Sequence, residues 1–322
     1  MNISIISIVV FLVCVSGAKC DDEVVRRFVE VEPGVKLEVL DWGGSGQPLV
    51  FLHGSGCTAH IFDHFAPKFL PSHRIIAITR RGAAGSDAPQ RGYGDERFGR
   101  DILSVLSALE IVRPILIGHS MAGSEMSWLN THFNEMFAGF VYLDAAGPLA
   151  FYSEFSNDPA YFPFEMLAMR QELDQLVPGS GELHPKSVAR QILQDMPTFQ
   201  HHLERWLEQN RNLPEPSAAD LRMIPPFVRE IALGIQRYPS LSGPILAIFP
   251  VSTDAAVKPQ LPQEPPASHS LSQIDAFEYC VASAKVVRIP GATHFVFQSN
   301  EDEVFRSIQE FVAKISGGDV VR

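Results

Sequence analysis

Short, uninterrupted runs of apolar residues alternate with segments of helical periodicity along this chain, and this alternation limits the folds open to it. The apolar runs cover residues 48–54, 73–82, 113–120 and 138–147. Runs of this kind suit strands that are buried on both faces, as in a parallel sheet. Helical spacing marks the segments between them, which are residues 59–70, 96–112 and 122–137. The pattern predicts an α/β fold with a mostly parallel central sheet flanked by helices.

Further elements extend this pattern at both ends of the chain. Residues 26–31 and 35–43 flank a Glu-Pro-Gly turn and predict an antiparallel hairpin. Residues 148–242 show helical segments and no clear strand, which predicts a helical insertion. Strands resume at 243–252 and 284–291, and a last helix over 299–316 has Ser299 or Asn300 as its N-cap. We therefore predict a core made of residues 22–147 and 243–318, with the insertion between them.

The N-terminus reads differently from the rest of the chain. An apolar run from Ile3 to Val15 is shorter than the roughly 20 residues of a membrane span, and Ser16 and Ala18 supply the small residues of a cleavage site. This predicts a signal peptide over residues 1–18 and a secreted or periplasmic protein. An uncleaved anchor is the alternative, because no Lys or Arg precedes the run. Cys20, Cys57 and Cys280 then remain, and secretion permits one disulfide among them, whose pairing the sequence leaves open.

The charge of the chain excludes some classes of partner. Its net charge is −11, which disfavours nucleic acids and anionic lipid surfaces. The pair Arg80 and Arg81 is too short to make a basic tract, and the cysteines are not spaced as a zinc site. We expect a small-molecule partner, no metal and no cofactor, and the oligomeric state stays open.

The segment GHSMAG, residues 118–123, places a polar Ser120 between a predicted strand and a predicted helix. A serine at such a turn is held with its hydroxyl exposed above the sheet, and the usual pattern is G-x-S-x-G. Here Ala122 replaces the last glycine and Gly123 follows it. Serine needs a base to act as a nucleophile. His294 suits this role, because it follows the last predicted strand at the same edge of the sheet.

A histidine base needs a carboxylate to orient it, and an oxyanion needs two N–H donors. We predict Asp254 as the carboxylate, because it follows the strand at 243–252 and precedes His294. Asp144 from the neighbouring strand is the alternative, and Glu125 is a third candidate. The predicted oxyanion donors are the backbone N–H groups of Met121 and Ser55, with Gly56 as the alternative to Ser55.

Five motifs in order, FLHGSG, RRGAAGSDAP, GHSMAG, LAIFPVSTD and GATHFVF, make the chain resemble the α/β-hydrolase superfamily. The second motif has Thr79 where the superfamily has an acid, and we expect a structural role for it. The resemblance implies that the insertion is a helical cap over the active site. Its apolar residues line a hydrophobic substrate pocket or pack the cap: Phe151, Phe155, Tyr161, Phe162, Phe164 and Met166.

The expected function is hydrolysis of a carboxylic ester or related acyl bond through an acyl-enzyme on Ser120, with His294 as base and Asp254 orienting it. Cofactor-free haloperoxidase or perhydrolase activity, or hydrolysis of a carbon–carbon bond, is an alternative on the same three residues. A ligand-binding protein of this fold without catalysis is an alternative of another class.

Overall fold

The protein is described from a computed structural model, which covers residues 24–158, 185–212, 236–253 and 270–318, with isolated positions between 166 and 176 and between 214 and 234. Eight strands form one sheet: β1 (Val25–Glu32), β2 (Val35–Gly43), β3 (Pro48–Leu52), β4 (Arg74–Ile78), β5 (Ile115–His119), β6 (Gly139–Leu143), β7 (Ile245–Val251) and β8 (Ala284–Pro290). All eight coincide with strands predicted from the sequence, and the α/β prediction is confirmed.

The strands follow the order β1-β2-β4-β3-β5-β6-β7-β8 across the sheet. Strand β1 pairs with β2 in the antiparallel direction, and so does β2 with β4. The six strands from β3 to β8 all run parallel to one another. The chain leaves β3 for β4 on one side and later reaches β5 on the other side. Ligands of open α/β sheets bind at the carboxyl ends of strands where the order reverses in this way.

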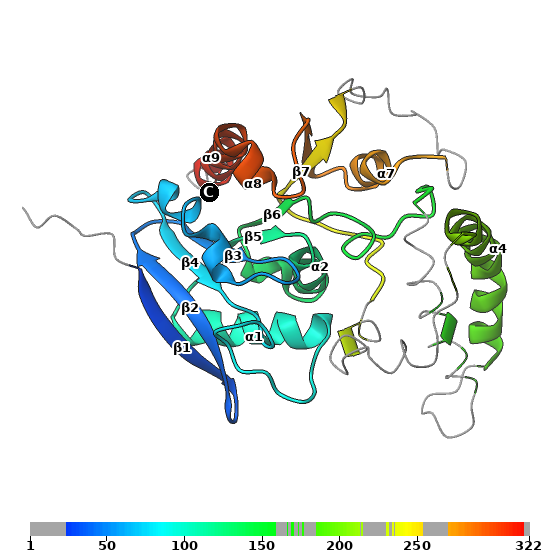
Figure 1. The fold of residues 1–322 in the computed structure, drawn as a ribbon, viewed down its shortest axis with the longest axis horizontal. Helices are drawn as coiled ribbons and strands as arrows, with labels where there is room; N and C mark the ends of the chain where they lie inside the picture. The colour runs from blue at the N-terminus through cyan, green and yellow to red at the C-terminus, as the bar shows by residue number, and fades with distance from the viewer. Residues whose placement is uncertain are drawn as a thin grey trace, which may run out of the picture.

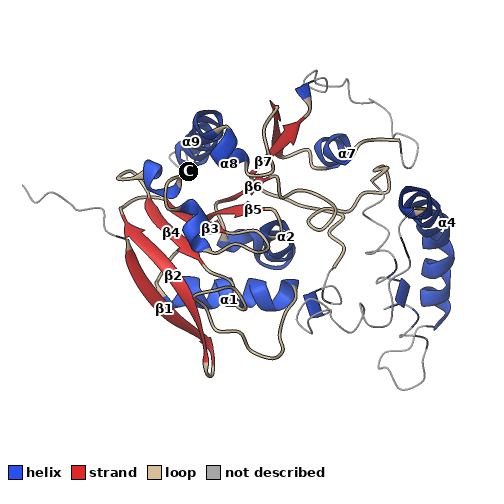
Figure 2. Cartoon of the chain, viewed as in Figure 1, coloured by secondary structure: helices blue, strands red, loops and turns tan. Residues whose placement is uncertain are grey.

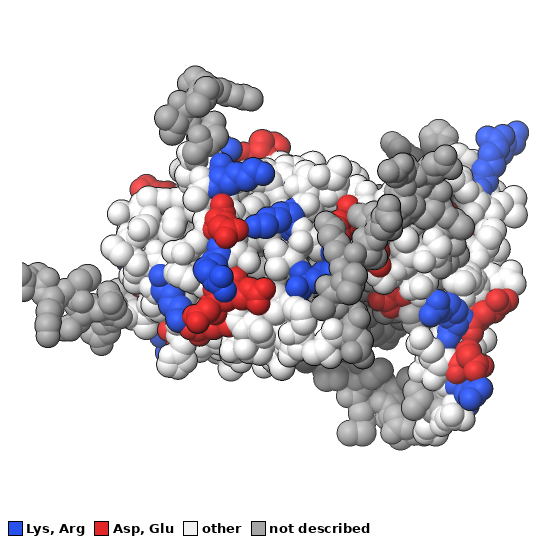
Figure 3. Space-filling view, turned by 90° about the horizontal axis from the view of Figure 1, so that it is seen from above, with Lys and Arg blue, Asp and Glu red and all other residues white. Residues whose placement is uncertain are grey.

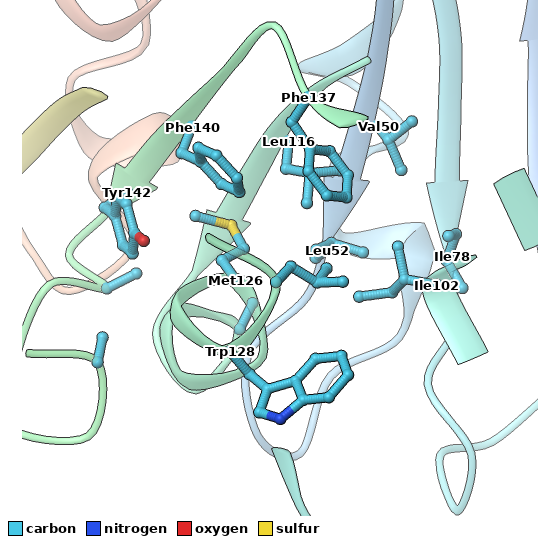
Figure 4. Close-up of a cluster of buried hydrophobic side chains, with 14 of the residues drawn as sticks. Val50, Leu52, Ile78, Ile102, Leu116, Met126, Trp128, Phe137, Phe140 and Tyr142 are labelled. Carbon is cyan, nitrogen blue, oxygen red and sulfur yellow. The ribbon is translucent and has the colours of Figure 1, made fainter. Parts of the chain in front are cut away.

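Helices cover both faces of the sheet (Figures 1 and 2). One face packs against α1 (Asp95–Ala108), α2 (Ala122–Phe133) and α7 (Gln273–Cys280), and the other against α8 (Val296–Ser299) and α9 (Glu301–Gly318). On the first face, Met126 of α2 lies against Leu116 and Phe140 of the sheet (Figure 4). Each face thus has its own hydrophobic cluster, which fixes the strand ends in a rigid frame.

Several predicted helices differ in the structure. Residues 59–70 do not form an α-helix but two 3₁₀ turns, Ala59–Phe62 and Ala66–Phe69, because Pro67 has no N–H to donate and interrupts the pattern. The third predicted helix also ends early: α2 stops at Phe133 and a 3₁₀ turn, Asn134–Met136, follows. Helix α7 was not predicted. It is only eight residues long, too short to show a clear helical period.

The segment between β6 and β7 contains α4 (Pro185–Asn210), which lies within the predicted helical insertion and continues through Pro197. Figure 1 shows α4 beyond α7, away from the hairpin of β1 and β2. Of the predicted apolar cap residues, Phe151 is buried against Phe277 of α7, with ring centroids 5.1 Å apart, and belongs to the core. Tyr161, Phe162 and Phe164 lie outside the described residues.

The described part of the chain contains no helix long and apolar enough to cross a membrane. Acidic and basic side chains are interspersed on the face shown in Figure 3. Cys57 and Cys280 are both free thiols, so they do not form a disulfide with each other. Cys20 and the predicted signal peptide over residues 1–18 lie outside the described residues, and secretion stays a prediction.

Candidate active site

The turn from β5 to α2 holds Ser120 at the carboxyl edge of the sheet. Ser120 has a φ of 55°, in the left-handed region that residues other than glycine seldom adopt. Its backbone N–H donates to the carbonyl of Leu143 at 3.2 Å, and its own carbonyl accepts from Gly123 at 2.9 Å. A β-carbon at Gly123 would overlap the carbonyl oxygen of Ala145. These contacts explain why small residues surround the serine, which is half-buried in the structure, whereas the sequence predicts an exposed hydroxyl.

Asp144 and His294 form a hydrogen-bonded pair at the same edge. Asp144 follows β6 directly, and its Oδ2 lies 2.6 Å from Nδ1 of His294. A carboxylate only accepts hydrogen bonds, so Nδ1 carries the proton and Nε2 of His294 is left to take a proton from another group. Burial raises the pKa of the Asp144 carboxyl, while the hydrogen bond and the charge of His294 act in the opposite direction.

The three acidic residues that could orient His294 differ in what the structure shows of them. Asp254 lies outside the described residues, so it stays a prediction. Asp144, the alternative, is the carboxylate that contacts His294. Glu125 is occupied elsewhere, because it is fully buried and accepts two hydrogen bonds from Arg80, at 2.9 and 2.7 Å.

The loop after β3 lies directly beside the serine. A β-carbon built on Gly54 would lie 2.9 Å from Cβ of Ser120. The following residue, Ser55, lines a cavity of about 410 Å³ together with Met121, which is the first residue after Ser120. The N–H groups in the first turn of a helix have no acceptor within the helix, and Met121 precedes α2. Ser55 and Met121, the two predicted oxyanion donors, therefore line the same cavity, and each adjoins in sequence one residue of the close contact between Gly54 and Ser120.

The close approach of Gly54 to His119 and Ser120 predicts the effect of Gly54→Ala. The added β-carbon would lie 2.8 Å from Nδ1 of His119 and 2.9 Å from Cβ of Ser120, and both neighbours are held by the sheet. We expect Gly54→Ala to lower the free energy of unfolding by about 1–3 kcal/mol and the rate of any Ser120-dependent reaction by about 100-fold. Denaturant unfolding and steady-state kinetics measure both. Gly147→Ala is the matched control, because a β-carbon there meets nothing within 4 Å. Wild-type values for Gly54→Ala would contradict the packing described here.

Two arginines of the RRGAAGSD motif are buried under the cavity, which the sequence did not indicate. Arg80 pairs with Glu125, and the guanidinium of Arg81 donates two hydrogen bonds to Asp101, at 2.5 and 2.7 Å. Both arginines line the cavity. Because a carboxylate faces each guanidinium, they add shape to the cavity wall but little net positive charge. Thr79 bonds Glu38 at 2.8 Å, which confirms a structural role for this motif.

His53 is a structural residue of the HG turn. Its Nε2 accepts from the backbone N–H of Arg80 at 2.9 Å, and its Nδ1 donates to the carbonyl of Gly54 at 2.7 Å. Burial and the nearby charge of Arg80 lower the pKa of His53 to about 3, so it is neutral at physiological pH. It holds the turn after β3 that carries Gly54 and Ser55.

A sequence model of the alpha/beta hydrolase family matches residues 49–307. This range runs from β3 into α9 and includes Ser120, Asp144 and His294. The chain belongs to the alpha/beta hydrolase family. Solved structures agree on the fold: an esterase from Thermogutta terrifontis covers 91% of the chain with a TM-score of 0.55 at 19% identity. A bromoperoxidase from Bacillus anthracis covers 90% with a TM-score of 0.56 at 17% identity. Both matches span 99% or more of those structures.

Sequence relatives of this alpha/beta hydrolase carry several functional names. An AB hydrolase superfamily protein, YisY of Bacillus subtilis, is 29% identical over 51% of the chain and 58% of its own length. A non-heme chloroperoxidase of Streptomyces lividans is 34% identical over 31% of the chain and 37% of its own length. The chain thus aligns with less than two thirds of these relatives. They agree on the family and not on one reaction.

No group of three or more His, Cys, Asp or Glu side chains in the described ranges is arranged to hold a metal ion. The predicted chemistry of this alpha/beta hydrolase needs none, and the absence of a cofactor stays a prediction.

Proposed function

We propose that this alpha/beta hydrolase cleaves carboxylic esters with Ser120 as nucleophile, His294 as base and Asp144 as the acid that orients it. The observation that carries the proposal is the Asp144–His294 hydrogen bond at the sheet edge where Ser120 occupies a left-handed turn. Asp144 takes the place first predicted for Asp254. Neighbouring strands support the arrangement, because Ser120 directly follows β5, Asp144 directly follows β6, and the two strands are paired in parallel.

The proposed reaction has two steps. Oγ of Ser120 attacks the carbonyl carbon while Nε2 of His294 takes its proton, and the N–H groups of Ser55 and Met121 stabilise the oxyanion. His294 then protonates the leaving alcohol, which leaves the acyl group on Ser120. In the second step His294 takes a proton from water, the hydroxide attacks the acyl carbon, and the acid leaves as Ser120 is re-protonated. Asp144 stabilises the His294 cation that forms in both steps.

The proposed acyl group is uncharged and of short to medium length. The cavity of about 410 Å³ beside Ser55 and Met121 is at the small end for ligand sites, and it also contains apolar Phe98 and Ile231. Its two arginines are each faced by a carboxylate, so a substrate carboxylate gains little there. We further propose that residues 148–242 form the cap over this edge of the sheet.

A panel of p-nitrophenyl esters from acetate to decanoate tests this function. We expect kcat/KM to be highest within the range from acetate to hexanoate and to fall towards decanoate, with all turnover lost in Ser120→Ala. Equal inertness of the wild-type protein and Ser120→Ala towards every ester would contradict ester hydrolysis.

A second candidate is perhydrolysis, which the non-heme chloroperoxidases among the relatives favour. In this reaction hydrogen peroxide in place of water attacks the acyl-Ser120, and the peroxyacid that leaves oxidises a halide. Chlorination of monochlorodimedone by the protein with acetate, chloride and peroxide tests it. If the protein catalyses perhydrolysis, we expect halogenation to require both acetate and Ser120. Halogenation that persists in Ser120→Ala would contradict this candidate function.

A further inference from the structure

His119 lies between the two halves of the proposed site. It precedes Ser120 at the end of β5, and its side chain is 1% exposed. Its Nε2 lies 3.0 Å from the backbone carbonyl oxygen of His294, and the two imidazole rings are 4.6 Å apart. A carbonyl oxygen accepts only, so Nε2 of His119 is the donor. One histidine therefore ties the backbone of the other to the strand that carries Ser120.

The backbone of His294 has few other restraints among the described residues. The side chain of His294 is 48% exposed, so packing against neighbouring residues restrains this part of the loop only weakly. Thr293 donates its N–H to Oγ of Ser299 at 3.0 Å, and Asp144 holds the His294 ring. The bond from His119 is the one that joins this loop directly to β5. Its loss should let the His294 ring move relative to Ser120.

The second nitrogen of His119 points to the other side of the site. Nδ1 is buried and has no hydrogen-bond partner among the described residues, and a β-carbon on Gly54 would lie 2.8 Å from it. The ring of His119 thus lies between Gly54, in the loop after β3, and the loop after β8 that carries His294. Phe295 and Phe297 enclose it, with centroids 4.9 and 5.3 Å away.

A neutral donor is the suitable group at this position. Burial lowers the pKa of His119 to about 4, so the ring is uncharged at neutral pH. A Lys or Arg there would place a permanent charge next to a histidine that must itself become positive during the reaction.

We propose that His119 is a positioning residue, which fixes the distance of His294 from Ser120 through the hydrogen bond from its Nε2 to the carbonyl of His294. The proposal rests on the proposed function, since it concerns the placement of the base. It predicts a loss in kcat rather than in KM, because His119 touches the catalytic groups and not the substrate.

The test compares His119→Phe, which keeps a ring and removes the donor, with His119→Gln, whose side-chain amide restores a donor. We expect kcat on the best ester to fall about 100-fold in His119→Phe with KM changed less than about twofold, and to recover at least tenfold in His119→Gln. His132→Phe is the matched control. His132 also bonds a backbone carbonyl, that of Trp128 at 2.8 Å, and stacks on its ring, but it lies at the far end of α2 and should leave kcat unchanged.

Hydrogen exchange of residues 291–299 supplies a readout that is independent of turnover. We expect faster exchange of these amides in His119→Phe and near wild-type exchange in His119→Gln. The proposal is overturned if His119→Phe has the same kcat and the same exchange rates as the wild type. It is also overturned if His119→Phe and His119→Gln are equally defective. An inert wild-type protein with the expected exchange pattern would instead contradict the proposed function and leave the positioning contact supported.

Discussion

Replacing Ser120 by alanine is expected to lower kcat for esters by about 10⁶-fold, the size of loss seen when the serine of a Ser-His-Asp site is removed. The loss follows because the proposed acyl-enzyme forms on Oγ of Ser120, and an alanine side chain carries no nucleophile. We expect the fold to be unaffected, since alanine is as small as serine and the turn is held by backbone hydrogen bonds. Steady-state kinetics and thermal unfolding on the same samples measure both effects.

Ser120→Gly separates activity from stability at this position. The left-handed φ of 55° costs a residue with a β-carbon about 1–2 kcal/mol, and glycine is free of this cost. Glycine loses more conformational entropy on folding, which cancels about 0.5–1 kcal/mol of this gain in stability. We expect Ser120→Gly to be inactive and more stable than wild type by about 0.5–1 kcal/mol. Ser104→Ala, on an exposed face of α1, is the control and should keep full activity. Substantial activity in Ser120→Ala would contradict the role of this serine.

The second large effect is expected at Asp144. Asp144→Asn should lower kcat by about 10⁴-fold, because an amide can donate to Nδ1 and so favour the wrong tautomer of His294. Asparagine tolerates a positive φ, and Asp144 has a φ of 46°, so the variant should fold normally. Kinetics of the two variants Asp144→Asn and Asp254→Asn measure the effect on the same ester.

The comparison of the two aspartates decides the identity of the acid. We expect Asp254→Asn to keep kcat within about threefold of wild type, because Asp144 already occupies the hydrogen-bonding position on His294. A 10⁴-fold loss in Asp254→Asn with normal activity in Asp144→Asn would restore the original prediction and reject the present assignment.

The strands were predictable from the sequence, and Ser120 and His294 could be singled out as candidates from it. Strands β3 to β7 are short apolar runs, and β1 and β2 flank a Glu-Pro-Gly turn. Ser120 stands out because it directly follows such a run, and His294 because it lies in the loop after the last strand. The acid was harder to predict, because Asp144 and Asp254 each follow a strand that ends at the same edge. The hydrogen bond between Asp144 and His294 becomes visible only in the three-dimensional structure.

Other features depend on contacts that a linear pattern does not contain. Arg80 looks like a surface cation in the sequence, yet it is buried because Glu125, on the helix after Ser120, lies opposite it. His119 flanks the serine in sequence, and its partner is 175 residues away. The turns at 59–70 were predicted as a helix because their apolar spacing is helical, and Pro67 decides against it.

Mass spectrometry of the protein after reaction with a fluorophosphonate tests the central claim most directly. The probe reacts with a serine only when a base activates it, and it reports on the nucleophile without any choice of substrate. The account predicts one adduct per chain, located on Ser120 by peptide mapping, absent in Ser120→Ala and formed much more slowly in Asp144→Asn. An unmodified wild-type protein under conditions that label a known serine esterase, or an adduct on any other residue, would contradict it.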